Sequence, residues 1–288
     1  MNYIGVELGG TKCVLILAGG PNEVLARETV ATTSSTETLS LIAATLRQWK
    51  SGPGFEALGI ASFGPLGFDP ALDDYGHTLA TPKPGWAQTD ILGPLQTAAG
   101  VPARIDTDVN GAALAEMRWG AGQGFDDFAY VTVGTGVGVG LIAHRKPMRG
   151  LGHCELGHIR VPRLLGDDWP GSCPFHGDCV EGLASGSALA ARFGDIGALA
   201  PDHPAWDPVV WALAQLCQAI LCAAAPRRIA MGGGVMERQP HLLAKIEAKL
   251  VESLNGFLEL PKGYVCRPGL GSDAGPLGAI AVAMTAKP

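Results

Sequence analysis

The 288-residue sequence lacks a concentration of positive charge. Charged residues make up only 17% of it, the formal net charge is −6, and lysine and arginine form no cluster. Proteins that bind nucleic acids usually present a basic face, so the composition argues against a nucleic-acid partner. An anionic ligand would have to be held by backbone N–H groups, helix ends or a metal ion.

Membrane and export signals are also missing. The N-terminus has no basic segment followed by an apolar run, which predicts a cytoplasmic protein without a signal peptide. The most apolar stretch, residues 209–225, is shorter than the roughly 20 residues that span a bilayer, so we expect a buried helix and no membrane. Seven cysteines, an odd number in a chain without an export signal, argue against a disulfide framework.

Apolar residues, by contrast, are plentiful at 47%, and their pattern predicts an α/β protein. A strand, a glycine turn and a second strand are expected over residues 4–18, and this arrangement recurs over residues 128–144. The repetition predicts two α/β lobes with a cleft between them. We place the N-terminal lobe at residues 1–112, completed by a C-terminal helix at 274–288, and the second lobe at 113–273.

The remaining elements follow from the periodicity of apolar residues and from turn signals. Residues 150–182, which carry most of the histidine and cysteine, are expected to be irregular. Further strands are expected at 24–30, 58–63, 103–106, 228–231 and 265–267, and helices at 38–49, 90–99, 110–119, from 187, from 208, and at 240–254.

Three glycine-rich turns each follow an apolar strand. Glycines at strand ends let backbone N–H groups approach phosphate oxygens, and a threonine hydroxyl adds a donor, so we expect phosphate contacts here. None of the turns matches a P-loop, and the residues after Gly138 read as a strand, whereas a dinucleotide fingerprint opens a helix. The turns are Gly9-Gly10-Thr11-Lys12, Gly134-Thr135-Gly136-Val137-Gly138 and Gly232-Gly233-Gly234.

A polar group of Asp106, Asp108 and Asn110 lies where a predicted strand meets a predicted helix. Asp108 is a good N-cap residue, and capping alone would account for it. Alternatively, its carboxylate takes a proton from a hydroxyl group as that hydroxyl attacks phosphorus. The residues alone do not decide between these two interpretations.

A cluster of histidine and cysteine in the segment 153–182 predicts a metal site. Two cysteines and two histidines at short spacing are the ligands of closed, structural zinc sites, and in a cytoplasmic chain they favour metal over a disulfide. His153 and Cys154 are competing candidates, but they precede Glu155 and lie outside the compact spacing. The expected ligands, in the pattern H-x14-C-x2-H-x2-C, are His158, Cys173, His176 and Cys179.

Segments spread over the whole chain resemble, in the same order, the ROK family of sugar kinases and repressors. The chain is most similar to the zinc-containing bacterial fructokinases, which also have glutamate in the first glycine loop, a Ser-Phe-Gly-Pro segment as at 62–65, and a Thr-Pro-Lys-x-Gly-Trp segment as at 81–86. The family segments here are Glu7-Leu8-Gly9-Gly10-Thr11-Lys12, Asp108-Val109-Asn110, Gly134 to Gly138, Glu155-Leu156-Gly157-His158 and Cys179 to Gly186.

This resemblance implies an actin/hexokinase-type (ribonuclease H-like) fold and an ATP-dependent, magnesium-requiring hexose kinase that forms a homodimer. Asp108 would be the catalytic base. The ATP phosphates would contact Gly9, Gly10, Thr11, Lys12, Thr135 and Gly136, and the nucleotide would be bordered by Ser187, Gly232, Gly233, Gly234, Val235 and Met236. The sugar would lie at Gly64, Thr107, Asp108, Glu155, His158 and Glu181, with His158 also a ligand of a structural zinc ion.

Two departures from the ROK glucokinases favour fructose over glucose. Thr107 stands where those enzymes have asparagine, and Glu7 stands where they have aspartate. A kinase for glucose, mannose or an amino sugar stays an alternative, as does a non-catalytic sugar sensor, although Asp108 and the glycine turns argue against the sensor. The first glycine turn begins at residue 9, so we expect no room for the DNA-binding segment of the ROK repressors.

Overall fold

The structure, a computed structural model, describes residues 1–81 and 83–286 and divides the chain into two compact units. Unit 1 consists of Met1–Gly120, Met148–His153 and the chain from Ser272, and unit 2 consists of Ala121–Pro147 and Cys154–Gly271. The predicted boundary after residue 112 would cut a continuous helix. The units divide after that helix, at Gly120, and a short segment from 148 to 153 returns to unit 1.

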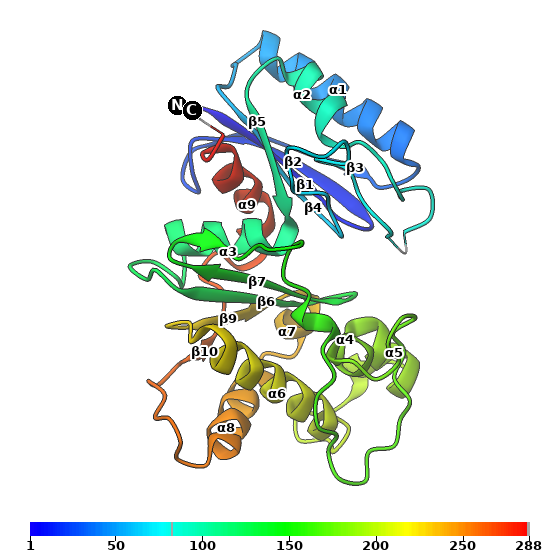
Figure 1. The fold of residues 1–288 in the computed structure, drawn as a ribbon, viewed down its shortest axis with the longest axis vertical. Helices are drawn as coiled ribbons and strands as arrows, with labels where there is room; N and C mark the ends of the chain where they lie inside the picture. The colour runs from blue at the N-terminus through cyan, green and yellow to red at the C-terminus, as the bar shows by residue number, and fades with distance from the viewer. Residues whose placement is uncertain (82, 287–288) are drawn as a thin grey trace. The chain divides into compact units, whose positions relative to one another are not determined.

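Unit 1 is built on a five-stranded mixed sheet in the order β3-β2-β1-β4-β5 (Figure 1). The first three strands pair antiparallel, and β1, β4 and β5 pair parallel. Helices α1 and α2 cover one face of this sheet, and α3 and α9 cover the other. The elements are β1 Tyr3–Leu8, β2 Lys12–Ala18, β3 Val24–Ala31, α1 Ser35–Ser51, β4 Leu58–Ser62, α2 Leu92–Ala99, β5 Ala103–Thr107, α3 Asp108–Trp119 and α9 Ala274–Ala283.

The alternation of side chains along β1 explains how this sheet is packed. Ile4, Val6 and Leu8 are fully buried in the core that α1 and α2 complete, as the period of two along a strand requires. Glycines open the opposite face, because a Cβ at Gly59 would lie 2.0 Å from the carbonyl oxygen of Ala279 in α9. A Cβ at Gly5 of β1, the strand that carries Glu7, would likewise lie 2.8 Å from the Cβ of Ala279, so α9 lies close to both strands.

Unit 2 also has a five-stranded mixed sheet, in the order β10-β9-β6-β7-β8. Its elements are β6 Phe128–Val133, β7 Val137–Ala143, β8 Lys146–Pro147, α4 Val180–Ala184, α5 Gly186–Phe193, α6 Trp206–Ala224, β9 Ile229–Gly232, α7 Gly234–Arg238, α8 Leu242–Leu254 and β10 Val265–Cys266. Helix α6 is long and apolar enough to cross a membrane, but its Trp206, Leu213 and Ile220 are fully buried in the core of unit 2. The expectation of a buried helix is therefore confirmed.

The predicted repetition is also confirmed, because β1–β2 and β6–β7 are antiparallel pairs joined by glycine turns. Two short helices differ from expectation. Helix α4 begins within the segment 150–182 that was expected to be irregular, and α7 begins at Gly234, where only a turn was predicted. The predicted C-terminal helix at 274–288 ends earlier, at Ala283. Residues 287–288 of the predicted range lie outside the described part of the chain.

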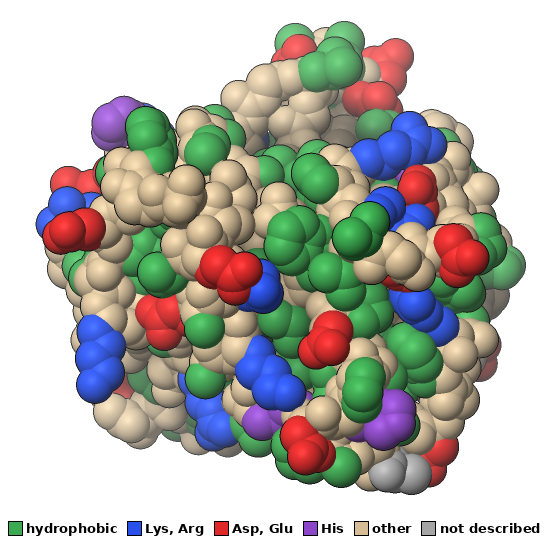
Figure 2. All heavy atoms as spheres, turned by 90° about the horizontal axis from the view of Figure 1, so that it is seen from below, with side chains coloured by type: hydrophobic (Ala, Val, Ile, Leu, Met, Phe, Trp, Pro, Cys, Tyr) green, Lys and Arg blue, Asp and Glu red, His purple; other side chains and the backbone are tan. Residues whose placement is uncertain are grey.

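Acidic and basic side chains are interspersed, with apolar ones between them, on the face of the molecule drawn in Figure 2. This agrees with the absence of any lysine and arginine cluster from the sequence.

Candidate active site

The first glycine turn is open to ligands. It connects β1 to β2, with the N–H of Gly9 donating to the carbonyl of Lys12 at 3.1 Å, and Gly10 and Thr11 are exposed at its tip. A Cβ at Gly10 would meet nothing within 4 Å, and Gly10 does not adopt the left-handed conformation that favours glycine. Neither packing nor backbone geometry therefore requires glycine at this position.

Asp108 is the first residue of α3 and is not its cap. The hydroxyl of Thr107 caps the helix by accepting a hydrogen bond from the N–H of Asn110 at 3.2 Å. The half-buried Asp108 carboxylate accepts from the N–H of Val109 at 2.8 Å. The capping interpretation of Asp108 is therefore wrong, and its carboxylate is placed at a helix N-terminus without being needed to cap it.

Asp106 has a separate role from Asp108, although the two lie together in the sequence. Its buried carboxylate accepts from the side-chain amide of Asn110 and from the N–H of Thr107, both at 2.8 Å. Its other oxygen forms an ion pair with Arg149, whose guanidinium lies 4.5 Å from the centre of the Phe68 ring. Asp106 is thus fully engaged in holding the segment 148–153 against β5.

Glu7, on the strand face opposite the apolar core, lies against the N-terminus of α9. A Cβ at Gly275 would be only 2.0 Å from Oε1 of Glu7, so a side chain at this helix end would displace the carboxylate from its position. Burial, and then the nearby charge of Asp108, raise the pKa of Glu7 to about 7. Glu7 and Asp108 are therefore electrostatic neighbours, as two carboxylates that face one ligand would be.

Gly64 lies beside the segment Met148–His153, which belongs to unit 1. A Cβ there would be 2.9 Å from Nε2 of His153, and that imidazole packs edge-on against Phe68 with ring centres 5.6 Å apart. His153 is thereby placed in unit 1, with the Asp106–Arg149 pair, and not among the predicted metal ligands.

The second glycine turn, between β6 and β7, is braced by α5. The N–H of Gly186 donates to the carbonyl of Gly134 at 2.7 Å, and the hydroxyl of Ser187 donates to the carbonyl of Thr135 at 2.9 Å. A Cβ at Gly134 would meet nothing within 4 Å, so this position is as open as Gly10. The structure thus brings together Thr135, Gly136 and Ser187, which the sequence analysis assigned to the nucleotide.

Glu181, on α4, lies next to both this turn and His158, one of the predicted metal ligands. Its Oε2 accepts from the N–H of Val137 at 3.1 Å, and a Cβ at Gly136 would lie 2.5 Å from that same oxygen. Its Oε1 lies 4.0 Å from Nε2 of His158. The pKa of Glu155 is raised above its ordinary value, mainly by burial; His158 opposes this rise and Glu181 adds to it.

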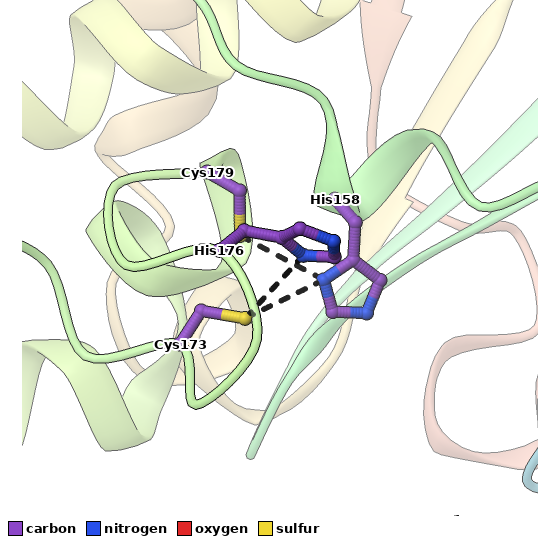
Figure 3. Close-up of side chains that lie close together, drawn as sticks. All are labelled: His158, Cys173, His176 and Cys179. Carbon is purple, nitrogen blue, oxygen red and sulfur yellow. Dashed lines mark hydrogen bonds between the residues drawn. The ribbon is translucent and has the colours of Figure 1, made fainter. Parts of the chain in front are cut away.

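The four predicted metal ligands converge, as Figure 3 shows. Their ligand atoms all lie within 4.8 Å of one another, and Nδ1 of His158 lies 3.7 Å from the sulfur atoms of both Cys173 and Cys179. Tetrahedral zinc with bonds of about 2.0–2.3 Å separates its ligand atoms by roughly 3.3–3.8 Å, so the nitrogen–sulfur separations of 3.7 Å fit this ion. His153 and Cys154 are not members of the group.

The surroundings of Cys179 and His158 bear on metal binding. Burial raises the pKa of the Cys179 thiol above its ordinary value, so a metal ion would have to displace its proton on binding. His158 turns Nδ1 toward the sulfur atoms and Nε2 toward Glu181. A histidine that binds a metal commonly has a carboxylate on its other nitrogen, and Glu181 occupies that position.

The third glycine turn is explained largely by packing. A Cβ at Gly232 would lie 2.7 Å from the ring of Pro268, and Gly233 has φ +90° and lies against Thr132. The side chains of Val235 and Met236 are buried in the core of unit 2. Any contact of these two residues with a nucleotide would have to come from the backbone.

Two residues with contacts at the site were given no role by the sequence analysis. Arg149 pairs with Asp106 across 43 positions, and Nζ of Lys83 lies 2.5 Å from the carbonyl oxygen of Gly10 across 73 positions. Lys83 belongs to the Thr81–Trp86 segment that marked the fructokinase resemblance, of which Pro82 lies outside the described residues. Local sequence gave no signal for either contact, because both partners are remote in the chain.

Comparisons with known proteins cover nearly the entire chain. Residues 3–286 match the ROK family. The sequence is 41% identical over 297 residues to a fructokinase from Zymomonas mobilis, covering 99% of this chain and 97% of that protein. It is 38% identical over 284 residues to a fructokinase from Pediococcus pentosaceus, covering 98% and 97%. A solved ROK family glucokinase from Streptomyces griseus, in complex with glucose and AMPPNP, gives a TM-score of 0.79 at 26% identity, covering 99% of this chain and 100% of that one.

Proposed function

The chain belongs to the ROK family, and we propose that it is an ATP-dependent fructokinase that converts fructose to fructose 6-phosphate. The observation that carries the proposal is the high identity to two bacterial fructokinases over nearly the full length of each protein. The glucokinase with the similar fold is only 26% identical, which is why fructose is preferred over glucose as the acceptor.

In the proposed reaction, Asp108 is the general base. Its carboxylate accepts the proton of the fructose 6-hydroxyl while that oxygen forms a bond to the γ-phosphorus of magnesium-bound ATP. The bond between this phosphorus and the β,γ-bridging oxygen breaks, and ADP leaves. The half-buried position of Asp108 at a helix N-terminus, where it is not used as a cap, supports this role.

Two open glycine turns are proposed to hold the ATP phosphates. Gly10 and Gly134 have free space where a side chain would lie, and backbone N–H groups at such turns bind phosphate oxygens. Lys12, Thr135, Gly136 and Ser187 belong to these turns or brace them, whereas the Gly232–Met236 segment is proposed to border the nucleotide through its backbone alone. Glu155, His158 and Glu181, with Gly64 and Thr107, are proposed to contact the sugar.

A zinc ion bound by His158, Cys173, His176 and Cys179 is proposed to have a structural role. Four protein ligands leave no open position for chemistry, and zinc would supply folding energy to a region rich in glycine and poor in apolar side chains. A cytoplasmic location and a homodimer are further proposals, and they rest on the family alone.

The proposal is tested by identifying the product. The purified protein, ATP, MgCl₂ and fructose should release ADP, and ³¹P and ¹³C NMR should place the phosphoryl group on the 6-hydroxyl. Adding a chelator should stop ADP release, and excess Mg²⁺ should restore it. Phosphorylation of another hydroxyl, or full activity with metal-free ATP, would contradict the proposed reaction.

A further inference from the structure

The side chain of Lys83 contacts the first glycine turn. Its Nζ lies 2.5 Å from the carbonyl oxygen of Gly10. A charged donor on a backbone carbonyl is a strong hydrogen bond, and this one reaches the tip of the turn that is proposed to bind phosphate.

Lys83 is held in place by a turn of its own. The N–H of Trp86 donates to the carbonyl of Lys83 at 3.3 Å, with Pro84 second in the turn and Gly85 third at φ +74°, which is the pattern of a type II turn. Trp86 is fully buried, and its indole N–H donates to the carbonyl of Thr33 at 2.9 Å. The base of the lysine side chain is therefore anchored, and the reach of its ammonium group is restricted.

The first glycine turn is hydrogen-bonded to Thr32, the neighbour of the Thr33 that binds Trp86. The hydroxyl of Thr32 donates to the carbonyl of Gly9 at 2.8 Å, and its N–H donates to the carbonyl of Thr11 at 3.0 Å. With Lys83 on the carbonyl of Gly10, three consecutive carbonyls of the turn accept from protein donors. In a trans peptide the carbonyl and the following N–H point in opposite directions, so the N–H groups of Gly10 and Thr11 point away from these donors.

Of the three donors, Lys83 is the one that controls the peptide between Gly10 and Thr11. Glycine tolerates both signs of φ, and a Cβ at Gly10 would meet nothing within 4 Å, so packing does not prevent this peptide from rotating. The bond from Lys83 fixes its direction, and the positive charge polarises it so that the Thr11 N–H becomes a stronger donor.

We propose that Lys83 is a positioning residue that sets the direction of the Gly10–Thr11 peptide for binding the phosphates of ATP. This inference rests on the proposed kinase function. It assigns a role to a lysine that is remote in the sequence from the turn it controls, and it predicts that the loss of Lys83 affects the nucleotide and not the sugar.

The test compares Lys83→Met and Lys83→Arg with a matched control. In the control, Lys245→Met, the altered lysine also donates to a backbone carbonyl, that of Pro201 at 2.7 Å, but it belongs to helix α8 of unit 2, which forms no part of either glycine turn. Calorimetric titration with AMPPNP and Mg²⁺ should show that Lys83→Met binds roughly 10- to 100-fold more weakly, as expected for loss of a charged hydrogen bond. Lys83→Arg should recover part of the loss, and Lys245→Met should bind like the parent.

Steady-state kinetics and thermal unfolding then distinguish a role in positioning the turn from a general loss of stability. For Lys83→Met the KM for ATP should rise while the KM for fructose and the melting temperature stay near those of the parent. Unchanged AMPPNP affinity would overturn the proposal. An equal rise of the KM for ATP and the KM for fructose, accompanied by a lower melting temperature, would also overturn it. If the parent binds AMPPNP but phosphorylates no sugar, the proposed function fails, while the titrations still decide the role of Lys83.

Discussion

Replacing Asp108 by asparagine is expected to separate catalysis from folding at the start of α3. The asparagine keeps an Oδ1 that can accept from the N–H of Val109, and the cap supplied by Thr107 is untouched. Loss of the carboxylate at the helix N-terminus costs about 0.3–1 kcal/mol. Relief of the repulsion with Glu7 acts in the opposite direction. The free energy of unfolding should therefore change by less than about 1 kcal/mol.

The rate, by contrast, should fall steeply. A positioned general base contributes roughly 10²–10⁴-fold, which corresponds to about 3–5 kcal/mol of activation free energy. Stopped or coupled assays of ADP release at saturating fructose and ATP measure this fall in kcat, and AMPPNP titration checks that nucleotide binding is retained. An Asp108→Asn protein that turns over within threefold of the parent would remove Asp108 from the mechanism.

Asp106→Asn is the matched control, since it removes a carboxylate from the same junction. Asp106 is buried and pairs with Arg149 and Asn110, so its loss should lower the free energy of unfolding by about 1–3 kcal/mol. Thermal unfolding should thus rank the two variants in the opposite order from kcat. If Asp108→Asn is the less stable of the two, the assignment of roles at this junction is wrong.

Three further outcomes follow from the site. Cys179→Ser should lose zinc by elemental analysis, lower the melting temperature and raise the KM for fructose more than that for ATP, because His158 connects the cluster to Glu181; loss of zinc with unchanged fructose binding would refute this connection. The raised pKa of Glu7, about 7 against an ordinary 4.5, means that the folded chain holds this proton more tightly than the unfolded chain. Without nucleotide and Mg²⁺, protonated Glu7 should contribute up to about 3 kcal/mol to the free energy of unfolding; this contribution is complete below pH 4.5 and is lost as the pH rises through 7. Glu7→Gln should reduce the dependence of the melting temperature on pH over this range. Gly10→Ala should leave stability unchanged or raised by up to about 1 kcal/mol, since a Cβ there has free space, yet weaken AMPPNP binding in titrations; a drop in stability instead would show that the protein itself needs this glycine.

Those parts of the fold that depend on apolar periodicity, turn residues and ligand spacing could be predicted from the local sequence. The antiparallel pairs β1–β2 and β6–β7 follow from apolar runs on either side of glycine turns. The convergence of the four predicted ligands follows from their spacing, since Cys173, His176 and Cys179 lie within one short loop. Helix α4 was missed because it has only five residues and directly follows the last of these ligands.

The rest of the site depends on contacts between distant parts of the chain. No local pattern shows that Lys83 reaches Gly10 or that Arg149 reaches Asp106. The role of Asp108 stayed open between cap and base because Thr107 and Asp108 are both good capping residues, and only the start of the helix decides which of them is the cap. Composition could not separate glycines that make room for a ligand from those that packing requires, such as Gly232.

The sharpest test of the assignment is the relative kcat/KM for common hexoses. Fructose, glucose, mannose and an amino sugar would each be assayed with ATP and Mg²⁺ at equal enzyme concentration, with ADP release as the common readout. Fructose should give the highest kcat/KM, with glucose and mannose weaker. A tenfold preference for glucose, or no sugar-dependent release of ADP at all, would contradict the proposal that this ROK protein is a fructokinase.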